Sequence, residues 1–231
     1  MSWHEVYRHL HDSITSGHLT VGSRLPSQSL LAVSFATTEH QVRKALARLK
    51  QGGLVVIWQG RGAEVAGAPL TSVLTASPQL RRDAERLAQG ISTETVSIRM
   101  RRAPPEVARV LQLQHTKTVI FRERLVRLGR VPAQVVRHYI VCDRWPSLLA
   151  SINETQSIRR SLLQHGVTDY HRDDAYLRGR LPTGHETTLL DIPRSQPVLE
   201  TEYRSVLPDG SPFLATYATS RADMINFRIV T

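Results

Sequence analysis

The chain has 231 residues, of which 41% are hydrophobic and 22% charged, so it can form a packed core and global disorder is excluded. Thirty Lys and Arg against twenty Asp and Glu give a formal net charge of +10, which favours a polyanionic partner. Cys142 is the only cysteine, which excludes an internal disulfide and a cysteine-based zinc finger and favours the cytoplasm. The amino terminus lacks a signal-peptide core and no apolar run is long enough to cross a membrane, so no membrane association is expected.

The first 67 residues predict three helices and a hairpin. Val6, Leu10 and Ile14 recur at a spacing of four within residues 3–16, as on one face of a helix that Gly17 ends. A second helix is predicted from Ser27, a capping residue type, to about residue 35. Its expected buried side is Leu30, Leu31 and Val33.

The helix predicted after Thr38 has an apolar and a polar face. The apolar face consists of Val42, Ala45, Leu46 and Leu49. The polar face consists of His40, Gln41, Arg43, Lys44, Arg48 and Lys50. Strands at 54–58 and 63–66, joined by a turn at 59–62, complete a winged helix-turn-helix plan, in which this helix reads the major groove.

Residues 68–76 are predicted to be a linker, and residues 77–231 a second domain for effector binding and dimerisation. It begins with a helix at 77–89. The expected strands are 93–102, 116–128, 131–142, 170–181, 197–207 and 212–220. The expected helices are 104–113, 146–152, 157–165 and 183–190. Because Gly129-Arg130 and Asp209-Gly210 join neighbouring strands as tight turns, the pattern favours an antiparallel α+β domain.

The first 67 residues resemble the GntR family of bacterial transcription regulators. The matching residues are Tyr7, Ile14, Gly17, Gly22, Leu25-Pro26-Ser27, Val42-Arg43, Ala45-Leu46, Leu49, Gly53-Leu54-Val55 and Gln59-Gly60-Arg61-Gly62. The remainder resembles the effector domain of the HutC branch, whose fold is similar to chorismate lyase. There the matches are Phe121-Arg122-Glu123-Arg124-Leu125, Gly129-Arg130-Val131-Pro132, Ser157, Leu162-Leu163 and the segment 221–227, which is most similar to regulators of phosphonate-use operons.

This resemblance implies a set of DNA-contacting residues. They are Ser27, Thr38, His40, Gln41, Arg43, Lys44 and, at the tip of the hairpin, Arg61. Gln41 is suited to read adenine, and Arg43 to read guanine or to bind phosphate. The chain departs from the family pattern at Gln28-Ser29 and at Glu39, where relatives carry residues that touch DNA.

Arg122 and Arg124 are the strongest candidates for effector binding. Two residues apart on a strand, they project from one face, while Glu123 points away. The resemblance places them in the effector pocket, where they would clamp a phosphate, phosphonate or carboxylate, with Ser157 capping the next helix. Arg221, paired with Asp223, reads first as a structural ion pair, although the resemblance also associates it with the effector site. The alternative for Arg122 and Arg124 is a surface ladder with Glu200 or Glu202.

The expected function is that of a dimeric transcription regulator, most simply a repressor. The first domain would bind a palindromic operator in double-stranded DNA, and a small anionic effector in the second would release it, with reorientation absorbed by the linker. No cofactor is expected, and His171, Asp173 and Asp174 read as a solvated strand end rather than a metal site. The alternatives are an enzyme of lyase-like fold and a nucleic-acid-associated protein without an effector.

Overall fold

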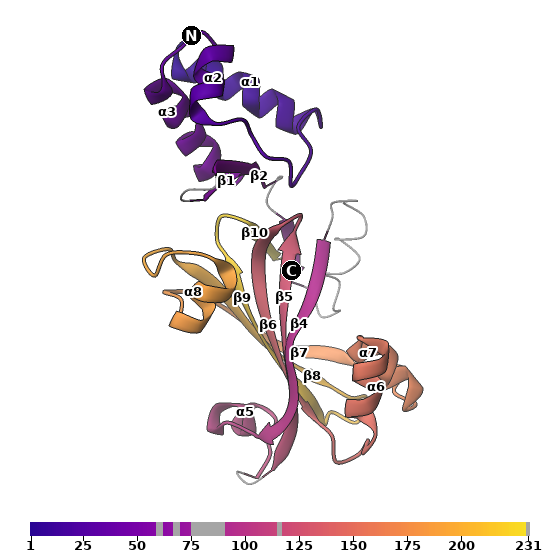
Figure 1. Ribbon diagram of the computed structural model, residues 1–231. Helices are drawn as coiled ribbons and strands as arrows, with labels where there is room; N and C mark the ends of the chain where they lie inside the picture. The colour runs from indigo at the N-terminus through magenta and orange to yellow at the C-terminus, as the bar shows by residue number, and fades with distance from the viewer. Residues whose placement is uncertain (59–61, 67–69, 75–90, 115–116, 230–231) are drawn as a thin grey trace.

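The computed structural model describes all residues except 59–61, 67–69, 75–90, 115–116 and 230–231. Figure 1 shows a small helical body, here called the head, beside a larger body built on one β-sheet. The predicted α+β class with an amino-terminal winged helix-turn-helix is confirmed.

The head consists of α1 (Trp3–Thr15), α2 (Gln28–Ser34) and α3 (Glu39–Gln51) followed by the hairpin β1 (Val55–Trp58) and β2 (Gly62–Val65). The predicted apolar stripes of the first and third helices are buried in one core cluster. That cluster fixes the orientation of α3, and with it the direction in which its polar face points.

The predicted buried side of α2 is wrong at two of its three positions. Leu31 is buried together with Ala32, whereas Leu30 and Val33 are 63% and 80% exposed. A seven-residue helix turns only a narrow stripe toward its neighbours, and here that stripe passes through positions 31, 32 and 35.

The second body is built on a six-stranded antiparallel sheet in the order β4-β5-β6-β9-β8-β7. Its strands are β4 (Ile91–Arg102), β5 (Thr118–Leu128), β6 (Val131–Val141), β7 (His171–Arg180), β8 (Val198–Val206) and β9 (Pro212–Arg221). Both predicted hairpins are present, β5–β6 about Gly129-Arg130 and β8–β9 about Asp209-Gly210.

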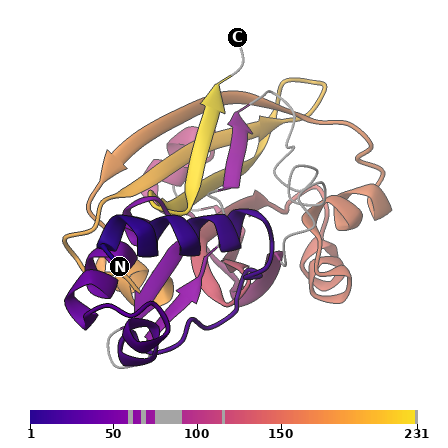
Figure 2. The same cartoon turned by 90° about the horizontal axis from the view of Figure 1, so that it is seen from above.

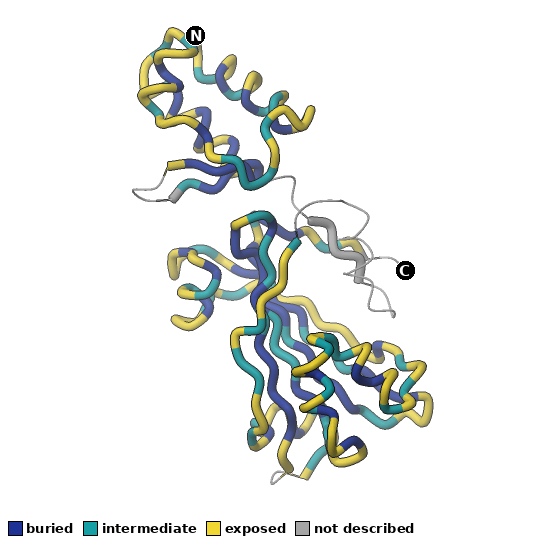
Figure 3. Tube along the Cα trace, turned by 45° about the vertical axis from the view of Figure 1, so that its right-hand side comes forward, coloured by how far each residue is buried: buried dark blue, intermediate teal, exposed yellow. Residues whose placement is uncertain are grey.

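Short helices cover both faces of the sheet in the described part of the chain (Figure 1). One face packs against α5 (Pro105–Val110) and α8 (Gly184–Leu190), and the other against α6 (Leu148–Thr155) and α7 (Ile158–Gln164). The strands between them form the buried centre of the domain (Figure 3). Neighbouring residues of β5 therefore belong to two separate environments.

The segment predicted as a linker contains a strand that the sequence analysis did not predict. Strand β3 (Leu70–Leu74) pairs in parallel with β10 (Ile225–Ile229), close to the carboxyl terminus (Figure 2). The helix predicted at 77–89 lies outside the described residues. The segment after the head is thus attached to the second body within a few residues.

The head also contacts the tip of the β5–β6 hairpin. Val56 and Ala66 of the head share an apolar cluster with Leu128 and Val131. At the turn, a Cβ on Gly129 would lie 3.2 Å from Val21 Cγ1, and Gly129 has a positive φ of 60°. The strand that carries Arg122 and Arg124 therefore ends, four residues after Arg124, against the head.

Candidate DNA interface and effector site

The exposed face of α3 is the candidate DNA interface. His40, Arg43 and Lys44 are exposed, while the opposite side of the helix is buried in the head. Arg43 and Lys44 form no hydrogen bond or ion pair with another described residue, so both cationic groups are available to an outside partner. Glu39 is exposed in the first turn of the same helix and adds a carboxylate beside them.

Three of the predicted DNA-contacting residues have structural roles as well. Ser27 Oγ accepts a hydrogen bond from the Leu30 N–H at 3.2 Å, and Thr38 Oγ1 accepts one from the Gln41 N–H at 3.4 Å, so both cap a helix. Gln41 Oε1 accepts a hydrogen bond from the Trp3 N–H at 3.0 Å. An amide oxygen has two lone pairs, so this bond leaves a second acceptor position on Oε1, and the reading of adenine by Gln41 stays a prediction. Arg61 lies outside the described residues.

The candidate effector site lies on the sheet face that packs against α6 and α7. Arg122 and Arg124 project to this side, and Glu123 projects to the other, as predicted. Arg122 is paired in register with His138 of β6, and His138 with Thr216 of β9. Directly paired residues of antiparallel strands share a face, so His138 and Thr216 lie beside the arginine pair.

Arg122 is a buried cation without a counter-charge among the described residues. Its side chain is 2% exposed, and its Nη2 donates to Thr95 Oγ1 at 2.9 Å and to the Gln156 main-chain oxygen at 3.1 Å. Its Nε and Nη1 are buried and have no hydrogen-bond partner in the described part of the chain. Burial, reinforced by the charge of Arg124, lowers the pKa of Arg122 to about 10. A buried guanidinium in this condition is suited to bind an anion.

His138 and Thr216 are further candidates that the sequence analysis missed. His138 Nδ1 and Thr216 Oγ1 are buried without a hydrogen-bond partner among the described residues. Burial, together with the charges of Arg124 and Arg122, lowers the pKa of His138 to about 3, so the ring is neutral at physiological pH. The two arginines therefore supply the positive charge of the site, and the histidine supplies one donor and one acceptor.

Ser157 lies next to this site, and Arg221 does not. Ser157 Oγ caps α7 by accepting from the Arg160 N–H at 3.3 Å, as predicted, and Ser157 directly follows Gln156. Arg221 pairs in register with Val198, on the face that packs against α8, and its guanidinium binds Asp223 at 2.7 Å. The structure therefore does not bring Arg221 to Arg122, because the two project from opposite faces of the sheet.

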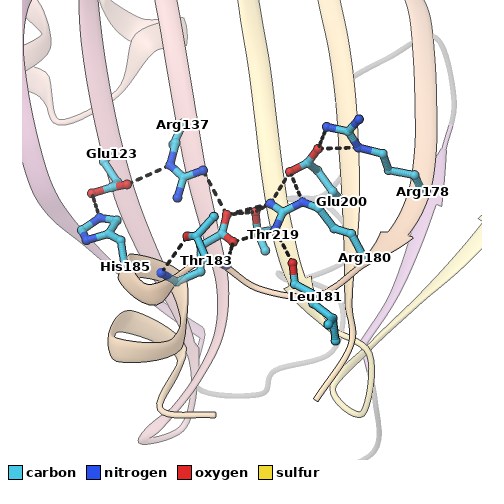
Figure 4. Close-up of polar contacts among 10 residues, drawn as sticks. Glu123, Arg137, Arg178, Arg180, Leu181, Thr183, His185, Glu200 and Thr219 are labelled. Atoms are coloured by element: carbon cyan, nitrogen blue, oxygen red, sulfur yellow. Dashed lines mark hydrogen bonds and ion pairs between the residues drawn. The ribbon is translucent and has the colours of Figure 1, made fainter. Parts of the chain in front are cut away.

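The opposite face of the sheet holds a network of alternating charges (Figure 4). Glu123 accepts from Arg137 at 2.9 Å and lies 2.9 Å from His185 of α8. Glu186, which is fully buried, accepts from Arg137 at 3.0 Å and from Arg180 at 2.7 Å. The alternative of a surface ladder between Arg122 and Glu200 is wrong. Glu200 lies on this face, opposite Arg122, and binds Arg178 and Arg180 instead.

The described residues include no group of three or more His, Cys, Asp or Glu side chains placed to hold a metal ion. Asp173 instead accepts a hydrogen bond from Arg204 Nε at 2.7 Å. No described helix is long and apolar enough to cross a membrane.

Comparison with known proteins identifies both bodies. The family model for bacterial regulatory proteins of the gntR family matches residues 3–65, and the model for the UTRA domain matches residues 88–226. This chain belongs to the GntR-family regulators that carry a UTRA domain.

Relatives that match over most of this chain are named as transcription regulators. A probable transcriptional regulator, PhnF of Escherichia coli strain K12, is 29% identical over 216 residues, covering 91% of this chain and 87% of PhnF. The transcriptional repressor NagR of Bacillus subtilis strain 168 is 22% identical over 228 residues, covering 97% of this chain and 92% of NagR. The crystal structure of PhnF from Mycobacterium smegmatis matches with a TM-score of 0.63 at 21% identity, covering 98% of each chain, and thus shares the fold of the whole UTRA-containing chain.

Proposed function

We propose that this GntR-family regulator is a cytoplasmic, dimeric repressor that binds a palindromic operator through α3 and is released by a small anion bound at Arg122 and Arg124. The observation that carries the proposal is the presence, in one chain, of an exposed cationic helix face and a buried arginine for which the described residues supply no counter-charge. The first suits DNA, and the second suits a small ligand that the domain can enclose.

A phosphonate or a phosphate ester is the effector class that this site fits best. A tetrahedral oxyanion offers several acceptor oxygens to two guanidinium groups, and Thr95, His138 and Thr216 can contact the remainder of the ligand. The resemblance of the segment 221–227 to regulators of phosphonate-use operons points to the same class. Regulation is favoured over a lyase-like enzyme because relatives that match over most of this chain are named as transcription regulators.

Replacing Arg43 by alanine tests the DNA-binding half of the proposal. We expect binding to the protein's own promoter region to weaken by about 1–3 kcal/mol if Arg43 contacts a base, because a base contact has that value. The measurement is fluorescence anisotropy titration with labelled promoter DNA at fixed ionic strength. Arg109→Ala, an exposed arginine of α5, removes the same charge from the other domain and serves as the matched control.

The two variants should differ in selectivity as well as in affinity. Arg43→Ala should reduce the preference for promoter DNA over unrelated DNA, whereas Arg109→Ala should leave that preference unchanged. Equal affinity and selectivity in Arg43→Ala and the wild-type protein would remove Arg43 from the interface.

A further inference from the structure

The Arg122 guanidinium is already occupied by Gln156, a residue of the same protein chain. Of the three oxygens around Arg122 Nη2, two belong to Gln156, the main-chain oxygen at 3.1 Å and Oε1 at 3.3 Å. The third, Thr95 Oγ1, also donates to Gln156 Oε1 at 3.2 Å. Gln156 therefore places two neutral oxygens where an anionic ligand of Arg122 would place charged ones.

The backbone at Gln156 holds this position in an unusual conformation. Gln156 ends α6 with φ 53°, in the left-handed region that costs a residue with a Cβ about 1–2 kcal/mol. Its side chain is held by a hydrogen bond from Nε2 to the Asn153 main-chain oxygen at 2.6 Å. Ser157, which directly follows it, is the N-cap of α7, so Gln156 connects the two helices that cover this face of the sheet.

We propose that Gln156 closes the anion site of the unliganded protein, and that the effector binds by displacing the Gln156 side chain from Arg122. The proposal rests on the effector role given to Arg122 above, and it adds that the Gln156 side chain competes with the effector for Arg122. An oxyanion adds the attraction of a full negative charge that the neutral amide oxygen lacks, and it can accept two parallel hydrogen bonds from one guanidinium, so it can replace the amide oxygen. The buried Nε and Nη1 of Arg122, unpaired among the described residues, provide further donors that the glutamine does not use.

If Gln156 closes the site, the apparent affinity for the effector falls in proportion to the fraction of molecules whose site is open. The apparent dissociation constant equals the intrinsic one divided by the fraction of molecules whose site is open. Removing the glutamine side chain raises that fraction, so the variant binds anions more tightly than the wild-type protein. Removing a residue that contacts the effector would instead weaken anion binding, so the direction of the change in affinity distinguishes the two roles.

Gln156→Gly tests the proposal because glycine tolerates the positive φ and removes Oε1. Isothermal titration with inorganic phosphate and with methylphosphonate is expected to give about tenfold tighter binding to the variant, as for the loss of one competing hydrogen bond to a charged group. Gln112→Gly is a matched control, since Gln112 is also a glutamine at positive φ, 55°, and directly follows the C-cap of the separate helix α5. It relieves similar backbone strain without touching Arg122 and should leave both affinities unchanged.

Chemical modification gives a second measurement that needs no effector. Arg122 in the wild-type protein should react with phenylglyoxal more slowly than the exposed Arg130, and Gln156→Gly should accelerate modification of Arg122, read by peptide mass spectrometry. Equal rates in the wild-type protein and the variant, or weaker anion binding by the variant, would overturn the closed-site proposal. Faster modification of Arg122 without protection by phosphate or methylphosphonate would keep the role of Gln156 and reject these anions as effectors.

Discussion

Replacing Glu186 by alanine should destabilise the UTRA domain by about 3–5 kcal/mol, the cost of removing one partner from a buried ion pair. Glu186 is fully buried and accepts hydrogen bonds from Arg137, Arg180 and Thr219. It also accepts from the Thr183 N–H at 2.9 Å, which completes the cap of α8. Alanine would remove the negative charge between two partly buried guanidinium groups and the cap at once.

The measurement is urea unfolding followed by a probe that reports on the sheet domain. Asp173→Ala is the matched control, because it breaks the more exposed pair with Arg204 and should cost no more than about 1 kcal/mol. Glu186→Gln keeps most of the hydrogen-bonding shape and should fall between the two. A loss below 1 kcal/mol in Glu186→Ala would mean that the network adds little to stability.

The same carboxylate predicts a loss of stability in acid. Burial alone would raise the pKa of Glu186, but hydrogen bonds from Arg180, the Thr183 N–H and Thr219 outweigh it and hold the pKa well below its ordinary value. A depressed folded-state pKa gives stability that is present above the unfolded pKa of about 4.3 and is lost as pH falls below it. Wild-type stability should therefore decline between about pH 5 and pH 2, and the decline should be shallower in Glu186→Gln. Equal pH profiles would contradict this.

Arg122→Ala should abolish the response to effector and leave operator binding unchanged. Truncating one partner of a buried charged pair costs about 2–5 kcal/mol of binding free energy, so titration with phosphate or methylphosphonate should show no saturation at concentrations that saturate the wild-type protein. Operator affinity should persist because Arg122 lies on the face covered by α6 and α7, away from α3. Folding should tolerate the change, since it removes a buried charge rather than its counter-charge.

Arg127→Ala is the matched control for this variant. Arg127 lies farther along the same strand and pairs with Glu94 at 3.7 Å, so the substitution removes the same charge without touching the site. Arg122→Lys keeps the charge but loses the planar fork and should retain part of the affinity. Release of Arg122→Ala from the promoter by the same anion concentration as the wild-type protein would contradict the clamp.

The sequence was sufficient for the head and for most of the sheet, because local patterns encode both. The apolar spacing of α3 and the tight turns at Gly129-Arg130 and Asp209-Gly210 fix elements and hairpins within a few residues. Strands β3 and β10 were missed because they pair in parallel across the whole length of the sheet domain. No local signal marks such a partner.

The neighbours of Arg122 could not be predicted because a bulge changes the register. Close to the turn, Leu128 pairs with Val131, and an unbroken ladder from there would place Arg137 opposite Arg122. The irregularity at Val126/Arg127 shifts the pairing by one residue, so His138 lies opposite Arg122 and Arg137 lies opposite Glu123. One extra residue thus separates two arginines that would repel and gives Arg137 its carboxylate partner.

The surface-ladder alternative failed for a related reason. Glu200 pairs with Thr219 and Glu202 with Tyr217, whereas the strand position in line with Arg122 is Thr216. Both glutamates therefore lie on the face opposite Arg122, where one of them balances Arg178 and Arg180. The register between paired strands decides on which face of the sheet each side chain lies. That register cannot be derived before the strand order is known.

The pairing of β3 with β10 leaves the head on a very short tether. Val65 ends β2 and Leu70 begins β3, so the Cα atoms of these two residues can be at most about 17 Å apart. In the proposed dimer, each head would therefore stay close to its attachment point and could not move far along a DNA duplex. If the chain dimerises through its UTRA domains as proposed, those domains would set the distance between the two half-sites of the operator. A five-base-pair insertion at the operator centre turns one half-site to the opposite side of the helix and is then expected to place that half-site out of reach.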